Sequence, residues 1–258
     1  MQNHKENILD QFTKQAVPFS MAPAIRDEPA LKLLLELTNA TAADTVLDVA
    51  CGPGIVVCVF ATVVQHAAGI DLAPAMVQRA KTLQKEKGLA NVTWEVGDVG
   101  SLPYADESFS IVTSRYAFHH LPEPRRVLSE MKRVCRPRGK VVLIDVLASV
   151  NAEKAALFNR MERLRDPSHV CALTLAEQRN LFQEVGLGNP QAAFYKLDME
   201  LESMLQRSFP NEGNADKVRQ MVLDSMGDDE MGIDTRREDS VVRFSYPISI
   251  LIAEEQAY

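Results

Sequence analysis

The sequence predicts an α/β fold: a doubly wound, mostly parallel seven-stranded sheet of the Rossmann-like kind with a helical insertion. Apolar, strand-like runs alternate with amphipathic helical segments between residues 45 and 146, a rhythm that produces parallel strands with helices on both faces. The run at 140–146 is almost continuously apolar, as expected for a buried parallel strand. The run at 45–50 leads directly into a tight turn that contains Gly52 and Gly54.

The same periodicities place each element along the chain. Leucines at helical spacing predict a helix over 28–40, and residues 1–22 are also expected to be helical. Strands are expected at 46–50, 67–71, 92–96, 108–114, 140–146, 191–197 and 241–252. Helices are expected at 55–64, from Pro74 past Leu83, at 122–136, at 151–166, from the capping box at Thr174 to near Gly186, and twice within 199–230.

The glycine turn after the first strand is typical of a nucleotide-like cofactor site. In a doubly wound sheet, the backbone N–H groups of this turn and the N-terminus of the next helix face a ligand at the carboxyl end of the strand. Glycine permits the backbone angles and the close approach that such a turn needs. A dinucleotide fingerprint requires a third small residue where Val57 stands, which argues against a nicotinamide cofactor.

Two acidic residues follow the second and third strands. Asp71 ends the second strand, where a carboxylate can accept both ribose hydroxyls, although an acid at this position can equally cap the next helix. Asp98 follows the third strand, where its oxygen can accept the exocyclic amine of adenine while Val99 packs on the ring. These acids add a ribose contact and an adenine contact to the glycine turn.

Taken together, these motifs resemble those of the class I S-adenosylmethionine-dependent methyltransferases. The matching segments, in order, are 46–54, 69–76, 97–104, 109–112, 115–121 and 128–140. Within the superfamily, the chain is similar to the small-molecule branch that includes the ubiquinone/menaquinone-biosynthesis methyltransferases. The run at 163–170 looks like that of bacterial methyltransferases of unassigned substrate. The resemblance implies S-adenosyl-L-methionine as cofactor and a small, apolar or aromatic, quinone-like acceptor that is methylated at carbon or oxygen.

The resemblance also implies which residues bind the cofactor. Asp48 and the turn at 50–54 would hold the methionine part and the sugar, Asp71 the ribose, and the backbone of Arg115 the methionine amine. An acid beside the turn suits a ligand that carries a sulfonium and an ammonium group. The full implied set is Asp48, Ala50, Gly52, Gly54, Asp71, Leu72 and Met76 (both against adenine), Asp98, Val99 and Arg115.

Three histidines are candidates for a general base, which methyl transfer needs only if the acceptor must lose a proton. His119 and His120 lie where the family places the floor of the acceptor pocket, and His120 is the favoured one because adjacent residues project differently. His169, in a turn after the fifth strand, is a further candidate. Hydrogen-bonded structural roles are the competing interpretation for all three. No histidine or cysteine spacing indicates a metal site.

We expect the whole chain, 1–258, to form one domain. Residues 1–40 would supply N-terminal helices that act as a lid, 41–150 the cofactor-binding half, and 151–258 the acceptor half, with a helical insertion at 199–240 over the pocket. Ordinary packing is the alternative to a lid function for Phe12, Phe19 and Met21. Core packing is likewise the alternative to apolar-acceptor binding for Met199, Met204, Met221, Met226 and Met231.

The composition bounds the location and the partners. A net charge of −7 disfavours nucleic acid as the main partner. Neither a signal peptide nor an apolar run long enough for a membrane span is present, and four unpaired-looking cysteines fit a reduced, cytoplasmic setting. A homodimer is a candidate assembly. The competing functions are a non-methylating cofactor-binding protein, a nicotinamide-dependent oxidoreductase, and a cyclase or isomerase on the same fold.

Overall fold

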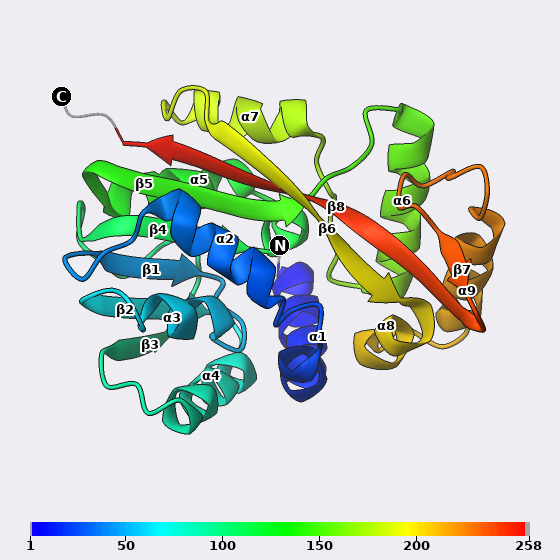
Figure 1. Ribbon diagram of the computed structural model, residues 1–258, viewed down its shortest axis with the longest axis horizontal. Helices are drawn as coiled ribbons and strands as arrows, with labels where there is room; N and C mark the ends of the chain where they lie inside the picture. The colour runs from blue at the N-terminus through cyan, green and yellow to red at the C-terminus, as the bar shows by residue number, and fades with distance from the viewer. Residues whose placement is uncertain (1, 256–258) are drawn as a thin grey trace.

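The computed structural model describes residues 2–255 and confirms the α/β fold class (Figure 1). One sheet has the strand order β3-β2-β1-β4-β5-β8-β6, and the short β7 pairs with β8 outside this path. The strands are β1 (Thr45–Val49), β2 (His66–Asp71), β3 (Val92–Val96), β4 (Phe109–Arg115), β5 (Cys135–Val146), β6 (Gln191–Glu200), β7 (Arg236–Glu238) and β8 (Val241–Glu254). The described sheet is therefore 8-stranded, one strand more than the sequence predicted, because β7 is a three-residue strand without a visible alternation.

Two kinds of strand pairing divide the sheet. The pairs among β1 to β5 are parallel, whereas β8 is antiparallel to both β5 and β6. The parallel part follows from the repeated strand–helix alternation, since each crossover returns the chain to the same end of the sheet. The carboxyl ends of β1, β2 and β4 therefore meet at one edge, where a ligand site is expected in an open α/β sheet.

Helices cover both faces of the sheet. α2 (Glu28–Thr38) and α3 (Ile55–Phe60) contribute to the core cluster on one face, and α5 (Pro124–Val134) and α7 (Leu175–Glu184) to the cluster on the other. Leu34 and Phe60 belong to the first cluster, and Leu128 and Phe182 to the second. The remaining helices are α1 (Gln2–Met21), α4 (Pro74–Glu86), α6 (Ala152–Arg165), α8 (Leu201–Ser208) and α9 (Asn214–Asp224).

Two groups of helices define the surroundings of the site. Helix α1 packs against both α4 and α8 and lies near the carboxyl ends of the parallel strands (Figure 1). Helices α6, α8 and α9 gather with β7 at one end of the sheet, beyond β6 and β8 (Figure 1). Two of these helices and β7 come from the segment between β6 and β8, which the sequence predicted as a helical insertion.

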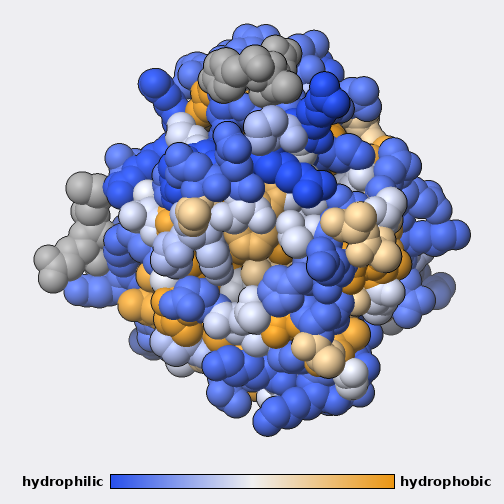
Figure 2. Space-filling view, turned by 90° about the vertical axis from the view of Figure 1, so that its left-hand side faces the viewer, coloured by the Kyte–Doolittle hydropathy of each residue, from blue (hydrophilic) through white to orange (hydrophobic). Residues whose placement is uncertain are grey.

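The outer surface is largely polar where Figure 2 displays it. Hydrophilic residues cover most of that face, and hydrophobic residues are scattered among them in smaller areas. Within residues 2–255, no helix combines the length and the hydrophobicity that a bilayer-crossing segment requires.

Candidate active site

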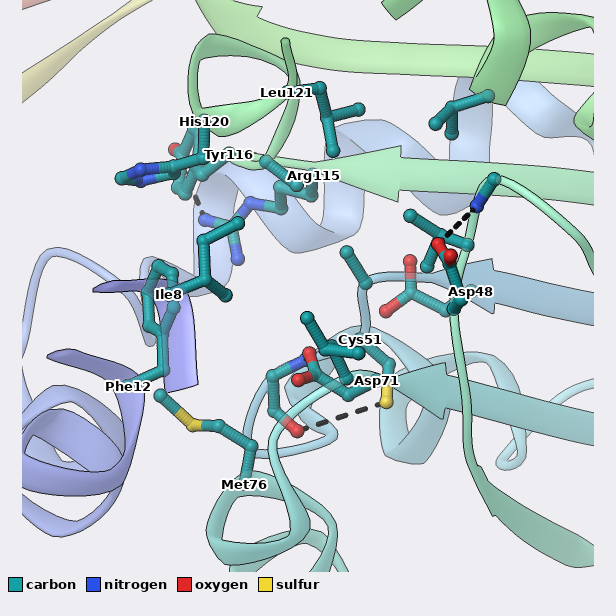
Figure 3. Close-up of a pocket in the computed structure, with 18 of the residues that line it drawn as sticks. Ile8, Phe12, Asp48, Cys51, Asp71, Met76, Arg115, Tyr116, His120 and Leu121 are labelled. Carbon is teal, nitrogen blue, oxygen red and sulfur yellow. Dashed lines mark hydrogen bonds between the residues drawn. The ribbon is translucent and has the colours of Figure 1, made fainter. Parts of the chain in front are cut away.

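A cavity of about 560 Å³ lies at the carboxyl ends of β1, β2 and β4, facing helix α1 (Figure 3). Asp48, Asp71 and Arg115 border it from the strand side, and Ile8 and Phe12 of α1 border it from the opposite side (Figure 3). The predicted cofactor residues that line it are Asp48, Ala50, Gly52, Asp71, Leu72, Met76, Asp98, Val99 and Arg115. The topology thus brings together residues that are separated by more than sixty positions in the chain.

Gly54 is the predicted cofactor residue that does not line the cavity. A Cβ atom at Gly54 would overlap the Trp94 ring and lie 2.7 Å from the Cβ of Ala80. Gly54 is therefore required for packing behind the turn, where helix α4 and β3 approach it. Gly52 differs, since its φ is +50° and a Cβ atom there would have nothing within 4 Å. Gly52 leaves open space at the cavity, as the sequence predicted.

Two residues that line the cavity have left-handed backbone conformations. Ala50 follows β1 with φ 58°, and Tyr116 follows β4 with φ 59°, although neither is glycine. Left-handed conformations of such residues are unfavourable by about 1–3 kcal/mol each and gather at functional sites. Ala50 and Tyr116 directly follow the adjacent strands β1 and β4, and both form part of the cavity wall.

Two buried carboxylates face the cavity with different partners. Asp71 accepts the N–H of Gly52 at Oδ2 and that of Ala73 at Oδ1, both at 2.8 Å. Burial raises the pKa of Asp71, and these two hydrogen bonds partly oppose the shift. In Asp48, Oδ1 is buried without a hydrogen-bond partner among the described residues. Burial raises its pKa well above the usual value, partly offset by the charge of Arg115. Asp48 is thus suited to a cationic ligand group.

The Arg115 side chain brings a positive charge to the same cavity. Its guanidinium donates to the carbonyl of Ile25 at 3.0 Å and to the Tyr116 hydroxyl at 3.2 Å, and it lies 4.3 Å from the centre of the Tyr116 ring. Among the side chains of residues 4–255 it has no ion-pair partner, and its described hydrogen-bond partners are neutral. The sequence predicted only a backbone role for Arg115. The unpaired guanidinium adds an anion-binding group to the site.

Helix α1 contacts the site through two residues that carry no sequence motif. The Lys5 ammonium lies 2.6 Å from Oδ2 of Asp98, and the His4 ring donates to the carbonyl of His120 at 2.8 Å. The hydrogen bond from Lys5 is the main cause that lowers the pKa of Asp98. Sequence reasoning missed these two contacts because the polar N-terminal segment has no hydrophobic periodicity that would indicate them.

A second, smaller cavity of about 100 Å³ adjoins the first. The two cavities share the wall residues Phe12, Phe19, Ile25, Tyr116 and His120. Apolar side chains from β6, α8 and β8 form much of the remaining lining, namely Leu197, Met199, Met204 and Ile248. Met21, a candidate lid residue, lines neither cavity and is 65% exposed. Met221, Met226 and Met231 also lie outside both linings.

His120 is the histidine that borders both cavities. Its Nδ1 lies 3.0 Å from the hydroxyl of Ser168, and its ring meets the Phe12 ring edge-on at 5.0 Å. Burial, reinforced by the neighbouring His119, lowers the pKa of His120 to about 4. The ring is therefore neutral at pH 7 and is able to accept a proton.

The other two histidines are held in different ways. His119 borders only the small cavity, and Asp145 accepts both its backbone N–H at 2.8 Å and its Nδ1–H at 2.6 Å. Burial disfavours charge on His119, but Asp145 outweighs it, so the pKa of His119 is raised. His169 lies outside both linings. Its Nε2 contacts Oδ1 of Asn159 at 2.7 Å, and its Nδ1 is buried without a partner among the described residues.

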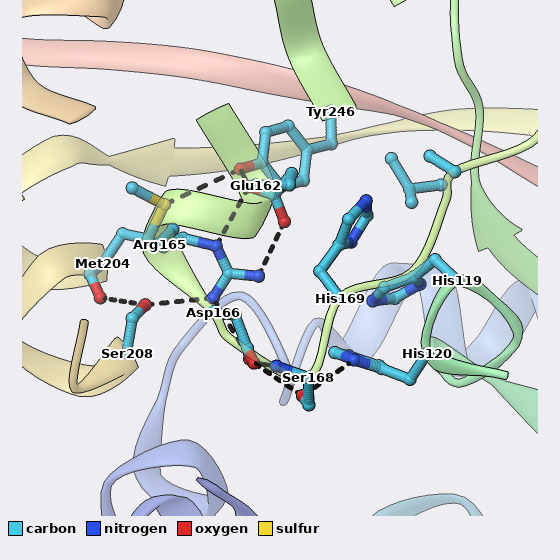
Figure 4. Close-up of polar contacts among 12 residues, drawn as sticks. His119, His120, Glu162, Arg165, Asp166, Ser168, His169, Met204, Ser208 and Tyr246 are labelled. Carbon is cyan, nitrogen blue, oxygen red and sulfur yellow. Dashed lines mark hydrogen bonds and ion pairs between the residues drawn. The ribbon is translucent and has the colours of Figure 1, made fainter. Parts of the chain in front are cut away.

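A buried ionic cluster, drawn in Figure 4, contributes Glu162, Arg165 and Tyr246 to the lining of the small cavity. Arg165 binds Glu162 through two hydrogen bonds of 2.9 and 2.6 Å, and the Tyr246 hydroxyl donates to the same carboxylate at 2.6 Å. These residues come from α6 and β8, which are far apart in the sequence. The periodicity of either segment alone contains no signal for this contact.

Comparisons with known proteins identify the family of this site. A family model described as "Methyltransferase domain" matches residues 47–143. The Bacillus subtilis protein described as "Uncharacterized methyltransferase YcgJ" is 32% identical over 196 residues, which are 76% of this chain and 78% of the relative. The chain belongs to the class I S-adenosylmethionine-dependent methyltransferases. S-adenosylmethionine is therefore its cofactor, and the nicotinamide alternative is set aside.

Further relatives agree with this assignment of the methyltransferase. The crystal structure of YcgJ superposes with a TM-score of 0.81 at 25% identity and covers 90% of this chain and 100% of YcgJ. A Bdellovibrio bacteriovorus protein described as "Ubiquinone/menaquinone biosynthesis C-methyltransferase UbiE" is 33% identical over 154 residues, covering 56% of this chain and 65% of the relative. The resemblance inferred from the motifs is thus confirmed.

The cavity of the methyltransferase fits this cofactor chemically. The cofactor carries an ammonium, a carboxylate and a sulfonium, and the cavity offers an unpartnered buried carboxylate oxygen at Asp48 and a guanidinium without an ion pair at Arg115. Unpaired buried charges of this kind are unfavourable until an opposite charge binds. Gly52 leaves free space beside them.

Proposed function

We propose that this methyltransferase methylates a small, largely apolar acceptor of aromatic or quinone-like character, at carbon or at oxygen. The observation that carries the proposal is the small cavity beside His120, in which apolar side chains such as Leu197, Met199 and Ile248 face a neutral imidazole. Methionine side chains adapt to irregular apolar ligands. An acceptor bound there would lie next to the large cavity, with which it shares a wall.

We propose the following division of the large cavity. The Asp48 carboxylate would hold the ammonium group and the Arg115 guanidinium the carboxylate of the amino-acid part, while Asp71 would bind the ribose. Asp98 and Val99 would contact adenine, with Leu72 and Met76 beside the ring. When bound, S-adenosylmethionine supplies an electrophilic methyl group on a sulfonium sulfur. The protein's contribution is alignment, which for a displacement reaction can itself lower the barrier by several kcal/mol.

His120 would act as the general base for acceptors that must lose a proton. An O–H or activated C–H proton of the acceptor would pass to the imidazole as the acceptor atom forms its bond to the methyl carbon. The lowered pKa of His120 keeps the ring in the neutral, proton-accepting form at pH 7. His119 carries a raised pKa and a carboxylate partner, so in this scheme it supports the pocket rather than accepting the proton.

The proposal is tested by incubating the full chain with methyl-labelled S-adenosylmethionine and a low-molecular-weight metabolite extract. Label should move to a small apolar product, and isolation of that product identifies the methylated atom. Asp71→Ala should abolish binding of S-adenosylhomocysteine, whereas His120→Ala should lower transfer and retain binding. Cofactor binding without transfer to any extract component would support the non-methylating alternative instead.

A further inference from the structure

We propose that Ser168 and Asp166 are positioning residues that fix His120 in the tautomer with its proton on Nδ1, so that Nε2 keeps the lone pair. The proposal rests on the proposed function, in which His120 accepts a proton from the acceptor. Both residues belong to the turn that follows α6 (Figure 4). Ser168 is 0% exposed and Asp166 is 1% exposed, so water does not compete for these contacts.

The direction of each hydrogen bond follows from the groups involved. The hydroxyl of Ser168 lies 2.5 Å from Oδ1 of Asp166 and 3.0 Å from Nδ1 of His120. An ionised carboxylate can only accept hydrogen bonds, and a hydroxyl has one proton to donate. The proton of Ser168 therefore points to Asp166, and the hydroxyl oxygen must accept from His120. Nδ1 of His120 is consequently the protonated nitrogen.

Asp166 is kept ionised by its surroundings. Its Oδ1 also accepts the backbone N–H of Ser168 at 2.9 Å, and its Oδ2 accepts from Gln15 at 3.1 Å and lies 3.8 Å from Arg165. Burial disfavours the charged carboxylate, but the charge of Arg165 and the hydrogen bonds from Ser168 act against it, and the pKa of Asp166 is lowered. An ionised Asp166 can only accept the hydrogen bond from Ser168. The assignment of the proton to Nδ1 of His120 depends on this.

The opposite nitrogen of His120 faces the cavities. The His120 ring borders both of them, and the side-chain hydrogen bond described for this ring, that with Ser168, is made at Nδ1. Nε2 is also absent from the buried, unpartnered atoms of the described residues, unlike Nδ1 of His169. The lone pair is thus presented to the space that a ligand would occupy.

His169 provides a built-in reference with the reverse tautomer. Its Nε2 contacts Oδ1 of Asn159 at 2.7 Å, and that amide oxygen also accepts the N–H of Ala172 at 2.7 Å. Since the oxygen accepts, Nε2 of His169 must carry the proton. In a neutral imidazole, the hydrogen bond made by one nitrogen decides which of the two nitrogens carries the proton. His120 and His169 should therefore be found as opposite tautomers.

The test is nitrogen-15 NMR of the histidine-labelled full chain saturated with S-adenosylhomocysteine at neutral pH. We expect the Nε2 signal of His120 in the unprotonated range and that of His169 in the protonated range. His120→Asn and His169→Asn assign the two sets of signals by their loss. Finding a protonated Nε2 on His120 in the unsubstituted protein overturns the proposal at once.

Ser168→Ala removes the acceptor of the Nδ1 proton and should shift His120 toward the tautomer protonated at Nε2, while the signals of His169 stay unchanged. Methyl transfer to the labelled extract component should fall by about 10²-fold, the low end of what a general base contributes. Asp166→Ala removes the acceptor of the Ser168 proton and frees the hydroxyl to donate to Nδ1 of His120, so it gives a second variant with the same readout if Ser168→Ala does not fold. Ser129→Ala removes an exposed hydroxyl on α5 and is the matched control.

The roles of His120 and of Ser168 are tested separately. A tautomer shift in Ser168→Ala without loss of methyl transfer contradicts the role of His120 as base. A loss of methyl transfer without a tautomer shift contradicts the positioning role of Ser168 and does not contradict the proposed function. An unshifted tautomer in both folded variants overturns the positioning role of Ser168 and Asp166.

Discussion

The carboxylate of Asp71, at the end of β2, accepts the backbone N–H of Gly52 in the turn after β1, over a distance of 2.8 Å. Its second oxygen accepts the N–H of Ala73 at the same distance. A residue that the motifs assign to ribose binding therefore also holds two backbone segments in place. Loss of this side chain should act on the ligand site and on the stability of the fold together.

Asp71→Asn should weaken both properties, because an amide offers one acceptor oxygen where the carboxylate offers two. We expect the free energy of unfolding to fall by about 1–3 kcal/mol, the range for an unsatisfied buried donor. Affinity for S-adenosylhomocysteine should fall at least about tenfold, equivalent to about 1.4 kcal/mol. Urea denaturation and titration calorimetry measure the two effects. Asp216→Asn, on the exposed side of α9, should change neither, and unaltered affinity in Asp71→Asn would contradict the ribose role.

The two glycines of the turn should respond differently to the same substitution. Gly54→Ala places a Cβ against Trp94 and Ala80, and we expect it to destabilise the protein by about 3 kcal/mol through overpacking and positive φ. Gly52→Ala meets no neighbour, so it should destabilise by about 1 kcal/mol. Gly52→Ala should, however, weaken cofactor binding, because its methyl group enters the cavity. Thermal unfolding with and without S-adenosylhomocysteine separates these outcomes, and equal melting temperatures for the two variants would refute the assignment.

Stability should depend on pH through His120. The pKa of its ring is lowered to about 4 in the folded protein and lies at about 6.5 in an unfolded chain. Between these values the unfolded state binds a proton that the folded state does not. The free energy of unfolding should therefore fall as pH falls through this window, by up to about 1.4 kcal/mol per pH unit for one proton.

His120→Asn is the variant that isolates this contribution, because the asparagine amide can still donate to Ser168. Urea denaturation of both proteins between pH 7 and pH 4 should give a shallower decline for the variant. Parallel stability curves would show that His120 does not titrate in the way its burial indicates.

The buried cluster of Glu162, Arg165 and Tyr246 should be sensitive to the loss of one member. Glu162→Ala leaves a largely buried guanidinium without its bidentate partner, and we expect a loss of about 3–5 kcal/mol. Tyr246→Phe removes one hydrogen bond to a charged group and should destabilise by about 1.5–3 kcal/mol. Urea denaturation measures both variants, and a smaller loss for Glu162→Ala than for Tyr246→Phe would refute the expected order.

The sequence predicted the parallel sheet and most of the large cavity for a physical reason. Apolar period and turn residues are local signals, and parallel β–α alternation converts them into a shared edge of strand ends. Asp71 and Asp98 could therefore be placed near one ligand without any knowledge of long-range contacts. Asp48 and His120 were selected by the family resemblance.

Contacts between distant segments were not predictable in this way. The collision of a Gly54 side chain with Trp94 depends on how β3 and α4 approach the turn, which no local pattern encodes. Lys5 meets Asp98 because α1 lies against the strand ends, and Ser168 meets His120 because the turn after α6 folds back. Each of these contacts depends on how helices and strands pack together, and that packing involves segments far apart in the sequence.

β8 lies between β5 and β6, with Ile250 opposite Ile144 on one side and Ala193 on the other. Residues 241–254 are the last of the described strands to leave the ribosome, yet they occupy an interior position in the sheet. Until they emerge, β5 and β6 each present an unpaired edge, a known route to aggregation. The small cavity also lacks Tyr246 and Ile248 during that interval. Completion of the small cavity must therefore follow synthesis of β8, whereas the turn around Gly52 can form while the chain is still growing.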